Sequence, residues 1–123
     1  MYLERILMEE EYKKWLTQLR KGYVELCILL VLNKNEKLHG LAILTLFKDI
    51  DFKIKEGTLY PLLNRMEQNE WLTSQWNMPN KGGHPKREYS ISPKGEEFLP
   101  LLLEAYHGHD KILQNLEGED NEN

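Results

Sequence analysis

The sequence predicts a mainly α-helical protein that carries one small β-hairpin in its second half. Apolar residues recur with a helical period over most of the chain. Residues 72–77 and 87–91 instead alternate with the period of two that is typical of strands. The stretch between them, MPNKGGHPK, holds two prolines and two glycines, which indicates a loop. A length of 123 residues fits a single domain.

Three helices are predicted before the central motif. Residues 3–19 form an amphipathic helix whose apolar face includes Tyr12 and Trp15, and this face packs either on its own domain or on a second subunit. A second helix is predicted from Gly22, where YVELCILLVL is apolar almost all round, as in the buried centre of a small domain. A tight turn at residues 38–40 leads into a helix over LAILTLFKDI.

The stretch EGTLYPLLNRMEQNEW, residues 56–71, places an apolar and a polar face on one helix. The inner face holds Leu59, Leu62, Leu63 and Met66. With Gly57 and Thr58 at or beside the N-cap, Pro61 is expected in the first turn, where its missing N–H has little cost. The outer face holds Gly57, Pro61, Asn64 and Gln68, flanked by Thr58, Tyr60 and Arg65. Free N–H groups at the start of a helix bind phosphates. Asn, Gln and Arg side chains form hydrogen bonds with the edges of bases. This face therefore either contacts a DNA duplex or is an ordinary solvated face.

The charge distribution along the chain favours contact with a DNA duplex over an ordinary solvated face. The net charge is −4, but four acidic residues lie in residues 117–122, so the first 116 residues sum to zero. Residues 71–94 carry a local charge of +3. Binding to phosphates depends on such a local patch, because counterions are released locally. The hairpin loop is therefore predicted to be a basic tip.

The last predicted helix begins at Ser92 and Pro93, as N-cap and first helical residue, and carries a wide apolar stripe. Pro100 and Gly108 are expected to kink or break it. Because so much apolar surface is unusual on a monomer, a two-fold dimer is expected, with its recognition helices ~34 Å apart. The residues expected at this interface, as plain packing or around an effector cavity, are Tyr12, Trp15, Phe98, Leu102 and Tyr106.

Three helices followed by a hairpin with a basic tip is the order of a winged helix-turn-helix, whose third helix enters the major groove. The segments LRKGYVELCILLVL, LHGLAI, EGTLYPLLNRME and KGGHPKREYSIS, the last followed by SPKGEEF, resemble the PadR family of bacterial transcriptional regulators. The resemblance runs from about residue 19 to residue 103. It implies a dimeric repressor that binds a palindromic operator, with dimerisation through the N-terminal and C-terminal helices. Small hydrophobic or phenolic compounds, where known in the family, relieve repression.

Carried over by position, the resemblance places Thr58 and Tyr60 in contact with DNA at the start of the recognition helix. The complete set of expected DNA contacts is Thr58, Tyr60, Pro61, Asn64, Arg65, Gln68, Lys81, Gly82, Gly83, Lys86, Arg87 and Tyr89. Two positions depart from the family pattern. Glu70 replaces a usual glycine, so Asn69 is expected to supply the left-handed cap. Glu88 replaces a usual aromatic and is expected to pair with a neighbouring lysine or arginine.

The expected organisation has four parts. Residues 1–20 form the N-terminal helix, 21–92 the winged helix-turn-helix, 93–117 the C-terminal dimerisation helix, and 118–123 a disordered acidic tail. No apolar run of ~18 residues, no secretory signal and a single cysteine, Cys27, point to a cytoplasmic protein without a membrane partner.

Other classes of function are disfavoured. No nucleophile triad or nucleotide fingerprint is present, and His107 and His109 lack a third ligand at regular spacing. Neither an enzyme, a cofactor nor a metal is therefore expected. The stronger rival is a winged-helix module that binds only protein.

Overall fold

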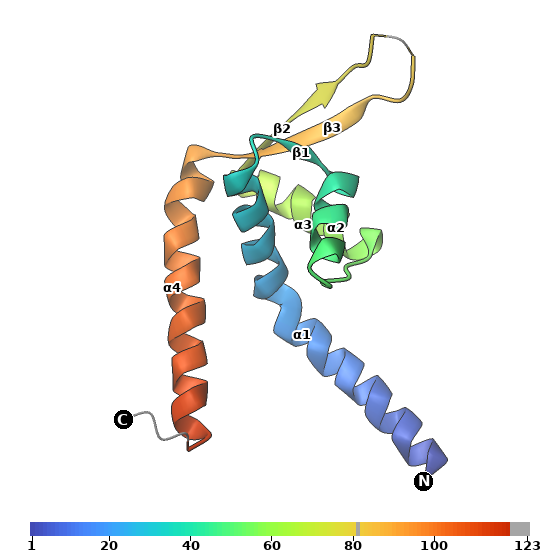
Figure 1. Ribbon diagram of the computed structural model, residues 1–123, viewed down its shortest axis with the longest axis vertical. Helices are drawn as coiled ribbons and strands as arrows, with labels where there is room; N and C mark the ends of the chain where they lie inside the picture. The colour runs from blue at the N-terminus through green and yellow to red at the C-terminus, as the bar shows by residue number, and fades with distance from the viewer. Residues whose placement is uncertain (81, 119–123) are drawn as a thin grey trace.

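The computed structural model describes residues 1–80 and 82–118. The elements, in chain order, are α1 (Tyr2–Lys34), β1 (Leu38–His39), α2 (Gly40–Asp49), α3 (Glu56–Gln68), β2 (Leu72–Asn77), β3 (Lys86–Ile91) and α4 (Pro93–Leu116). One body is formed by the second half of α1 together with α2, α3 and the sheet (Figure 1). The hairpin extends from this body in one direction, and the N-terminal half of α1 and the C-terminal half of α4 extend in the other. None of the described helices is long and apolar enough to cross a membrane.

The first helix is longer than the sequence indicated. The prediction of two helices is wrong, because α1 continues through Gly22 without a break. One glycine inside a helix costs about 1 kcal/mol, which its many good helix-forming neighbours offset. The helix α4 is likewise continuous through Pro100 and Gly108, so the expectation of a break there is wrong. In α1 only the second half is buried.

The core lies where α1, α2 and α3 meet the sheet. The predicted inner face of α3 is confirmed for Leu59, Leu63 and Met66, while Leu62 is half-buried. The other fully buried large side chains are Val24, Ile28, Leu29, Leu32, Ile43, Phe47 and Leu72. Burying a side chain of this size stabilises the fold by about 1.5–3 kcal/mol. The outer face of α3 is therefore held at a fixed orientation by the packing of its inner face.

The sheet contains a third strand that the sequence pattern does not predict. Leu38 and His39 do not form a tight turn but the short strand β1, which pairs with β3, so the strand order is β1-β3-β2. His39 also caps α2, since its Nδ1 accepts a hydrogen bond from the N–H of Ala42 at 3.3 Å. A strand of two residues is too short for its alternation to be recognised in the sequence. The hairpin of β2 and β3 is confirmed.

The end of α3 corrects a second expectation. Asn69 has an ordinary φ of −81°, and it is Glu70 that takes the left-handed conformation, with φ of 66°. The N–H of Trp71 bonds the carbonyl of Met66, and that of Glu70 bonds Glu67, which is a Schellman motif. The left-handed residue therefore falls where the family's glycine is expected, although a side chain is present there.

Glycine at this position should stabilise the protein. Because Glu70 is exposed and left-handed, Glu70→Gly relieves backbone strain, and we expect the free energy of unfolding to rise by about 0.5–1 kcal/mol. Denaturant unfolding measures this. Asn69→Gly is the matched control, and it should give no gain because Asn69 is not left-handed. A Glu70→Gly variant that is less stable than the parent contradicts the prediction.

Candidate nucleic-acid interface

The helix α3 begins earlier than the sequence indicated. Its N-cap is Lys55 and its first residue is Glu56, so Pro61 lies in the second turn, and the expectation of the first turn is wrong. The ring has no N–H to donate, which leaves the carbonyl of Gly57 without its helical partner. Gly57 is exposed, so water can satisfy that carbonyl. A Cβ at Gly57 would meet nothing within 4 Å, so the glycine is not needed to make room for the ring of Pro61.

The predicted outer face of α3 is open to solvent. Asn64 and Gln68 are exposed, and the small residues Gly57, Thr58 and Pro61 nearer the start are exposed as well. A surface that is small at one end and carries two amides at the other can approach base edges closely. The exposure is as expected from the sequence, and contact of these residues with DNA stays a prediction.

Arg65 is not a free cation on this face. Its Nε donates to Oε2 of Glu25 at 3.1 Å, and its Nη2 donates to the same oxygen. The side chain of Glu25 is only 12% exposed, whereas that of Arg65 is 54% exposed. The pair therefore joins α3 to α1 and balances the charge of Arg65 inside the protein. The acidic partner comes from 40 residues earlier in the chain, which is why the helix alone did not reveal it.

Tyr60 is also engaged within the fold. Its ring lies against Gly40, the first residue of α2, so closely that a Cβ on Gly40 would come within 2.6 Å of the ring. Burial raises the pKa of the Tyr60 phenol, and the carboxylate of Glu56 adds to the effect. The hydroxyl therefore stays protonated at neutral pH and remains a hydrogen-bond donor. Tyr60 is half-buried, so only the exposed part of its side chain is accessible to DNA.

The wing is tied to α3 by a polar network. Nε of Arg87 donates to Oγ of Ser74 at 3.0 Å, its Nη2 donates to Glu67, and Ser74 Oγ donates to Glu67 at 2.6 Å. The guanidinium also lies over the ring of Tyr89. Glu67 is on α3, so the network fixes the angle between the hairpin and that helix. The charge of Arg87 is therefore balanced by Glu67 within the protein, and contact of its exposed part with DNA stays a prediction.

Tyr89 corrects the predicted set of contacts more clearly. It is 3% exposed and belongs to the core, so its side chain cannot reach DNA in this conformation. Glu88 accepts a hydrogen bond from Nδ2 of Asn77 at 3.3 Å, and within the described residues it has no lysine or arginine partner of the kind expected. The pairing of β2 with β3 explains this, since Asn77 lies opposite the residue two before Glu88, on the same face of the hairpin.

The tip of the wing is less basic than the sequence implied. Nζ of Lys94 donates to the carbonyl of Asn69, which places this lysine at the base of α4 rather than on the wing. Lys86 is exposed, and Gly82 and Gly83 take φ of 77° and 90° in the loop. Lys81 lies outside the described residues. Lys86 is therefore the described wing cation that remains available to a phosphate.

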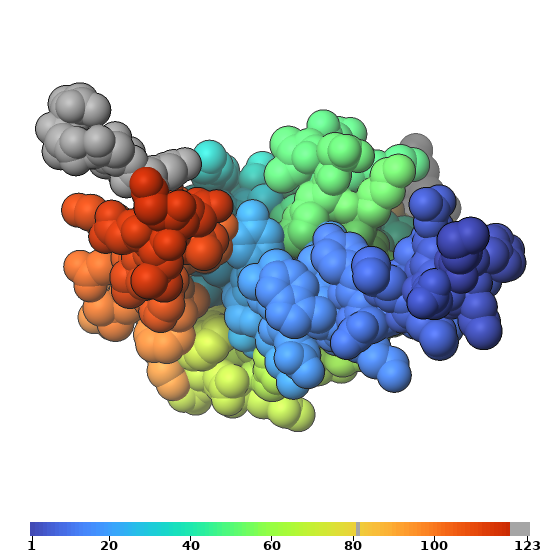
Figure 2. All heavy atoms as spheres, turned by 90° about the horizontal axis from the view of Figure 1, so that it is seen from below, coloured from blue at the N-terminus to red at the C-terminus, as the bar shows by residue number. Residues whose placement is uncertain are grey.

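The predicted interface residues lie apart in one chain. Tyr12 and Trp15 are exposed on α1 and stack on each other, with ring centroids 6.4 Å apart. Tyr106 of α4 instead packs on Tyr23 of α1, with the two ring centroids 5.4 Å apart. The remaining two, Phe98 and Leu102, are half-buried, and Phe98 packs on Trp71. The ends of α1 and α4 extend to the same side of the molecule, where both lie at the surface (Figures 1 and 2).

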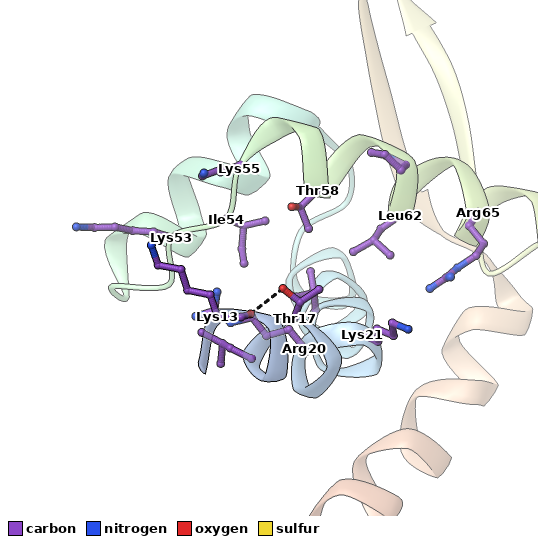
Figure 3. A pocket seen from close by; sticks show the side chains of 13 residues that line it. Lys13, Thr17, Arg20, Lys21, Lys53, Ile54, Lys55, Thr58, Leu62 and Arg65 are labelled. Atoms are coloured by element: carbon purple, nitrogen blue, oxygen red, sulfur yellow. Dashed lines mark hydrogen bonds between the residues drawn. The ribbon is translucent and has the colours of Figure 1, made fainter. Parts of the chain in front are cut away.

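A basic cleft beside α3 was not predicted. It encloses about 560 Å³ between α1 and the start of α3, and we call it the α1–α3 cleft. Its basic residues are Lys13, Arg20, Lys21, Lys53, Lys55 and Arg65 (Figure 3). Lys13, Thr17, Arg20 and Lys21 repeat at helical spacing, which is a signal in the sequence that could have indicated this face.

Comparison with known proteins agrees with this architecture. The model of the transcriptional regulator PadR-like family matches residues 28–100, more than half of the chain. A PadR-like transcription factor from Bacteroides fragilis is 31% identical, with 84% of this chain and 98% of that chain covered and a TM-score of 0.71. A PadR-like transcriptional regulator from Bacillus cereus is 27% identical, covering 84% and 99%, with a TM-score of 0.70.

A PadR family transcriptional regulator from Eggerthella lenta supports the fold alone, because it is 23% identical, with 94% and 99% covered and a TM-score of 0.75. No curated protein matches the chain significantly. The winged-helix fold predicted from the sequence is confirmed by these neighbours. The chain therefore belongs to the PadR-like family of transcriptional regulators and is not an enzyme.

Proposed function

We propose that the protein is a dimeric repressor that binds a palindromic DNA operator through the outer face of α3 and the wing. The observation that carries this proposal is the exposure of Asn64 and Gln68 on a helix whose opposite side buries Leu59, Leu63 and Met66. Such a helix has its polar side free while its position is fixed, which is what base readout in the major groove requires.

The contacts between α3 and the rest of the fold support the same proposal. Glu67 joins α3 to the hairpin through Ser74 and Arg87, and Arg65 joins α3 to α1 through Glu25. These links hold the recognition helix and the wing in one rigid unit. A surface that is already ordered loses less conformational entropy when it binds.

The dimer is supported by apolar surface on the terminal helices. Large apolar side chains exposed there include Leu7, Met8, Tyr12, Trp15, Leu19, Leu101, Ile112, Leu113 and Leu116. Two copies related by a two-fold axis would cover this surface. The rings of Tyr12, Trp15 and Tyr106 are the groups that would line a cavity for a small hydrophobic effector between the copies. A regulator of this kind acts where the chromosome is, in the cytoplasm.

Removing one of the two amides tests the proposal. Asn64→Ala should weaken binding to a duplex selected from a random pool by about tenfold, because one good contact to a base contributes about 1–3 kcal/mol. A mobility-shift titration at fixed salt measures the dissociation constant. Asn33→Ala, which removes an exposed amide at the end of α1, is the matched control and should change nothing.

Two outcomes count against the proposal. If the parent protein selects no duplex from the pool, the rival function as a module that binds only protein is favoured. If Asn64→Ala binds the selected duplex as tightly as Asn33→Ala does, the outer face of α3 does not read the bases.

A further inference from the structure

The α1–α3 cleft is a strongly basic, concave surface. Six of the thirteen residues that line it are lysine or arginine, and none of these lining residues, all within the described part of the chain, is acidic. Within residues 1–80 and 82–118, Arg65 is the one cation of the six with an ion-pair partner, which is Glu25. Lys13 and Lys53 lie at one end of the cleft, and Lys21 and Arg65 at the other (Figure 3). Cations gathered around a concavity attract an anion more strongly than the same charges on a flat face.

The cleft and the wing lie on opposite sides of the outer face of α3. At ~100° per residue, Thr58, Leu62 and Arg65 lie together on the side of the helix next to Pro61. These residues line the cleft. Glu67 lies on the other side of the helix, where it bonds the hairpin. In Figure 1 the hairpin and the N-terminal half of α1 extend in opposite directions from the level of α3.

This arrangement matches the shape of a major groove. The groove is about 12 Å wide and is bordered by a sugar-phosphate backbone on each side. When α3 lies in the groove, one border faces the wing and the other faces α1. The wing has exposed Lys86 for the first border. The second border then lies over the α1–α3 cleft.

The cleft remains open when α1 takes part in dimerisation. Lys13, Thr17, Arg20 and Lys21 share one side of the helix, as their helical spacing and their place in the cleft show. Between residues 8 and 19, the exposed large apolar residues of α1 follow a different stripe, formed by Met8, Tyr12, Trp15 and Leu19. The centres of the two stripes are about 155° apart around the helix, at ~100° per residue. A second copy on the apolar stripe therefore leaves the basic stripe free.

We propose that the α1–α3 cleft binds the phosphate backbone of the DNA strand that borders α3 on the side away from the wing. The N-terminal half of α1 is then part of the DNA-binding surface as well as of the dimer. The inference rests on the proposed function, because it needs α3 to enter a major groove. It adds a second, sequence-independent contact that fixes the orientation of α3 on the duplex.

Loss of two cleft cations tests the inference through the salt dependence of binding. In Lys13→Gln/Lys53→Gln both changed side chains are exposed, and each stays polar while it loses its charge. Arg20 is left intact because its guanidinium packs on the ring of Phe52. We expect the slope of log K against log salt to become shallower by about 1.8, since each lost phosphate contact contributes about 0.9. Affinity at physiological salt should fall about tenfold, equally for the selected duplex and for an unrelated duplex of the same length.

The control variant carries the same loss of charge elsewhere. Lys34→Gln/Lys111→Gln removes two exposed lysines that do not line the cleft, and its salt slope should equal that of the parent. Sedimentation of both variants checks that they stay in the oligomeric state of the parent. A Lys13→Gln/Lys53→Gln slope equal to that of the control, with the parent still binding DNA, overturns this inference alone. A parent that binds no duplex overturns the proposed function, and this inference with it.

Discussion

Replacing Gly95 with alanine should lower the free energy of unfolding by about 3 kcal/mol. Gly95 is buried at the start of α4, and a Cβ there would lie 2.3 Å from the carbonyl oxygen of Trp71 and 2.8 Å from Cγ1 of Ile91. The carbonyl cannot move away freely, because it accepts a hydrogen bond from the N–H of Ser92 at 3.0 Å. The start of α4 must therefore shift away from the connection between α3 and β2.

Denaturant unfolding at one fixed protein concentration measures this loss, since dimerisation makes stability depend on concentration. Gly108→Ala is the matched control on the same helix. A Cβ at Gly108 meets nothing within 4 Å, so alanine there should raise the stability by about 0.5–1 kcal/mol through its higher helix propensity. A loss of stability in Gly95→Ala together with a gain in Gly108→Ala supports the close contact at Gly95. A gain of stability in Gly95→Ala would show that α4 packs differently.

Removing the arginine of the pair between α3 and α1 should have the second largest effect on stability. Arg65→Met leaves the carboxylate of Glu25 without a partner in a site where that side chain is 12% exposed. Loss of one member of a fully buried pair costs about 3–5 kcal/mol, but the 54% exposure of Arg65 lets solvent screen this pair. We therefore expect a loss of about 1–3 kcal/mol, measured by denaturant unfolding.

Two further variants identify the cause of that loss. Arg5→Met changes an exposed arginine at the start of α1 in the same way and should be close to neutral. Glu25→Met/Arg65→Met removes both charges, and it should recover most of the stability because no unpaired carboxylate remains. If the double variant is as unstable as Arg65→Met, the pair does not explain the effect. A double variant that is stable but binds DNA weakly would assign Arg65 a second role at the duplex.

Local signals in the sequence were enough for most of the fold. The helical spacing of Leu59, Leu63 and Met66 identified the buried face of α3, because side chains three and four residues apart share one side of a helix. Ser92 was correctly identified as the N-cap of α4, where its Oγ accepts from the N–H of Gly95 at 3.0 Å. Each of these features depends on residues within one or two turns of each other.

The candidate site shows the limit of such reasoning. Which residues of α3 are exposed followed from the helical period, but the state of the charged side chains did not. Arg65 and Arg87 were expected to contact DNA, and the structure shows that each has a carboxylate partner on another element. The α1–α3 cleft was missed because its cations come from α1, from the loop before α3 and from α3 itself.

By itself the sequence determined most of the helical segments, the hairpin and which side of α3 faces water, since these follow from the spacing of apolar residues along the chain. Only the tertiary structure decided which cations keep their charge available, because a carboxylate 20 or 40 residues away in sequence can lie within hydrogen-bonding distance in space. It also decided that Glu70 takes the left-handed position and that Tyr89 is buried. These outcomes depend on how the elements pack together, and no local pattern records that packing.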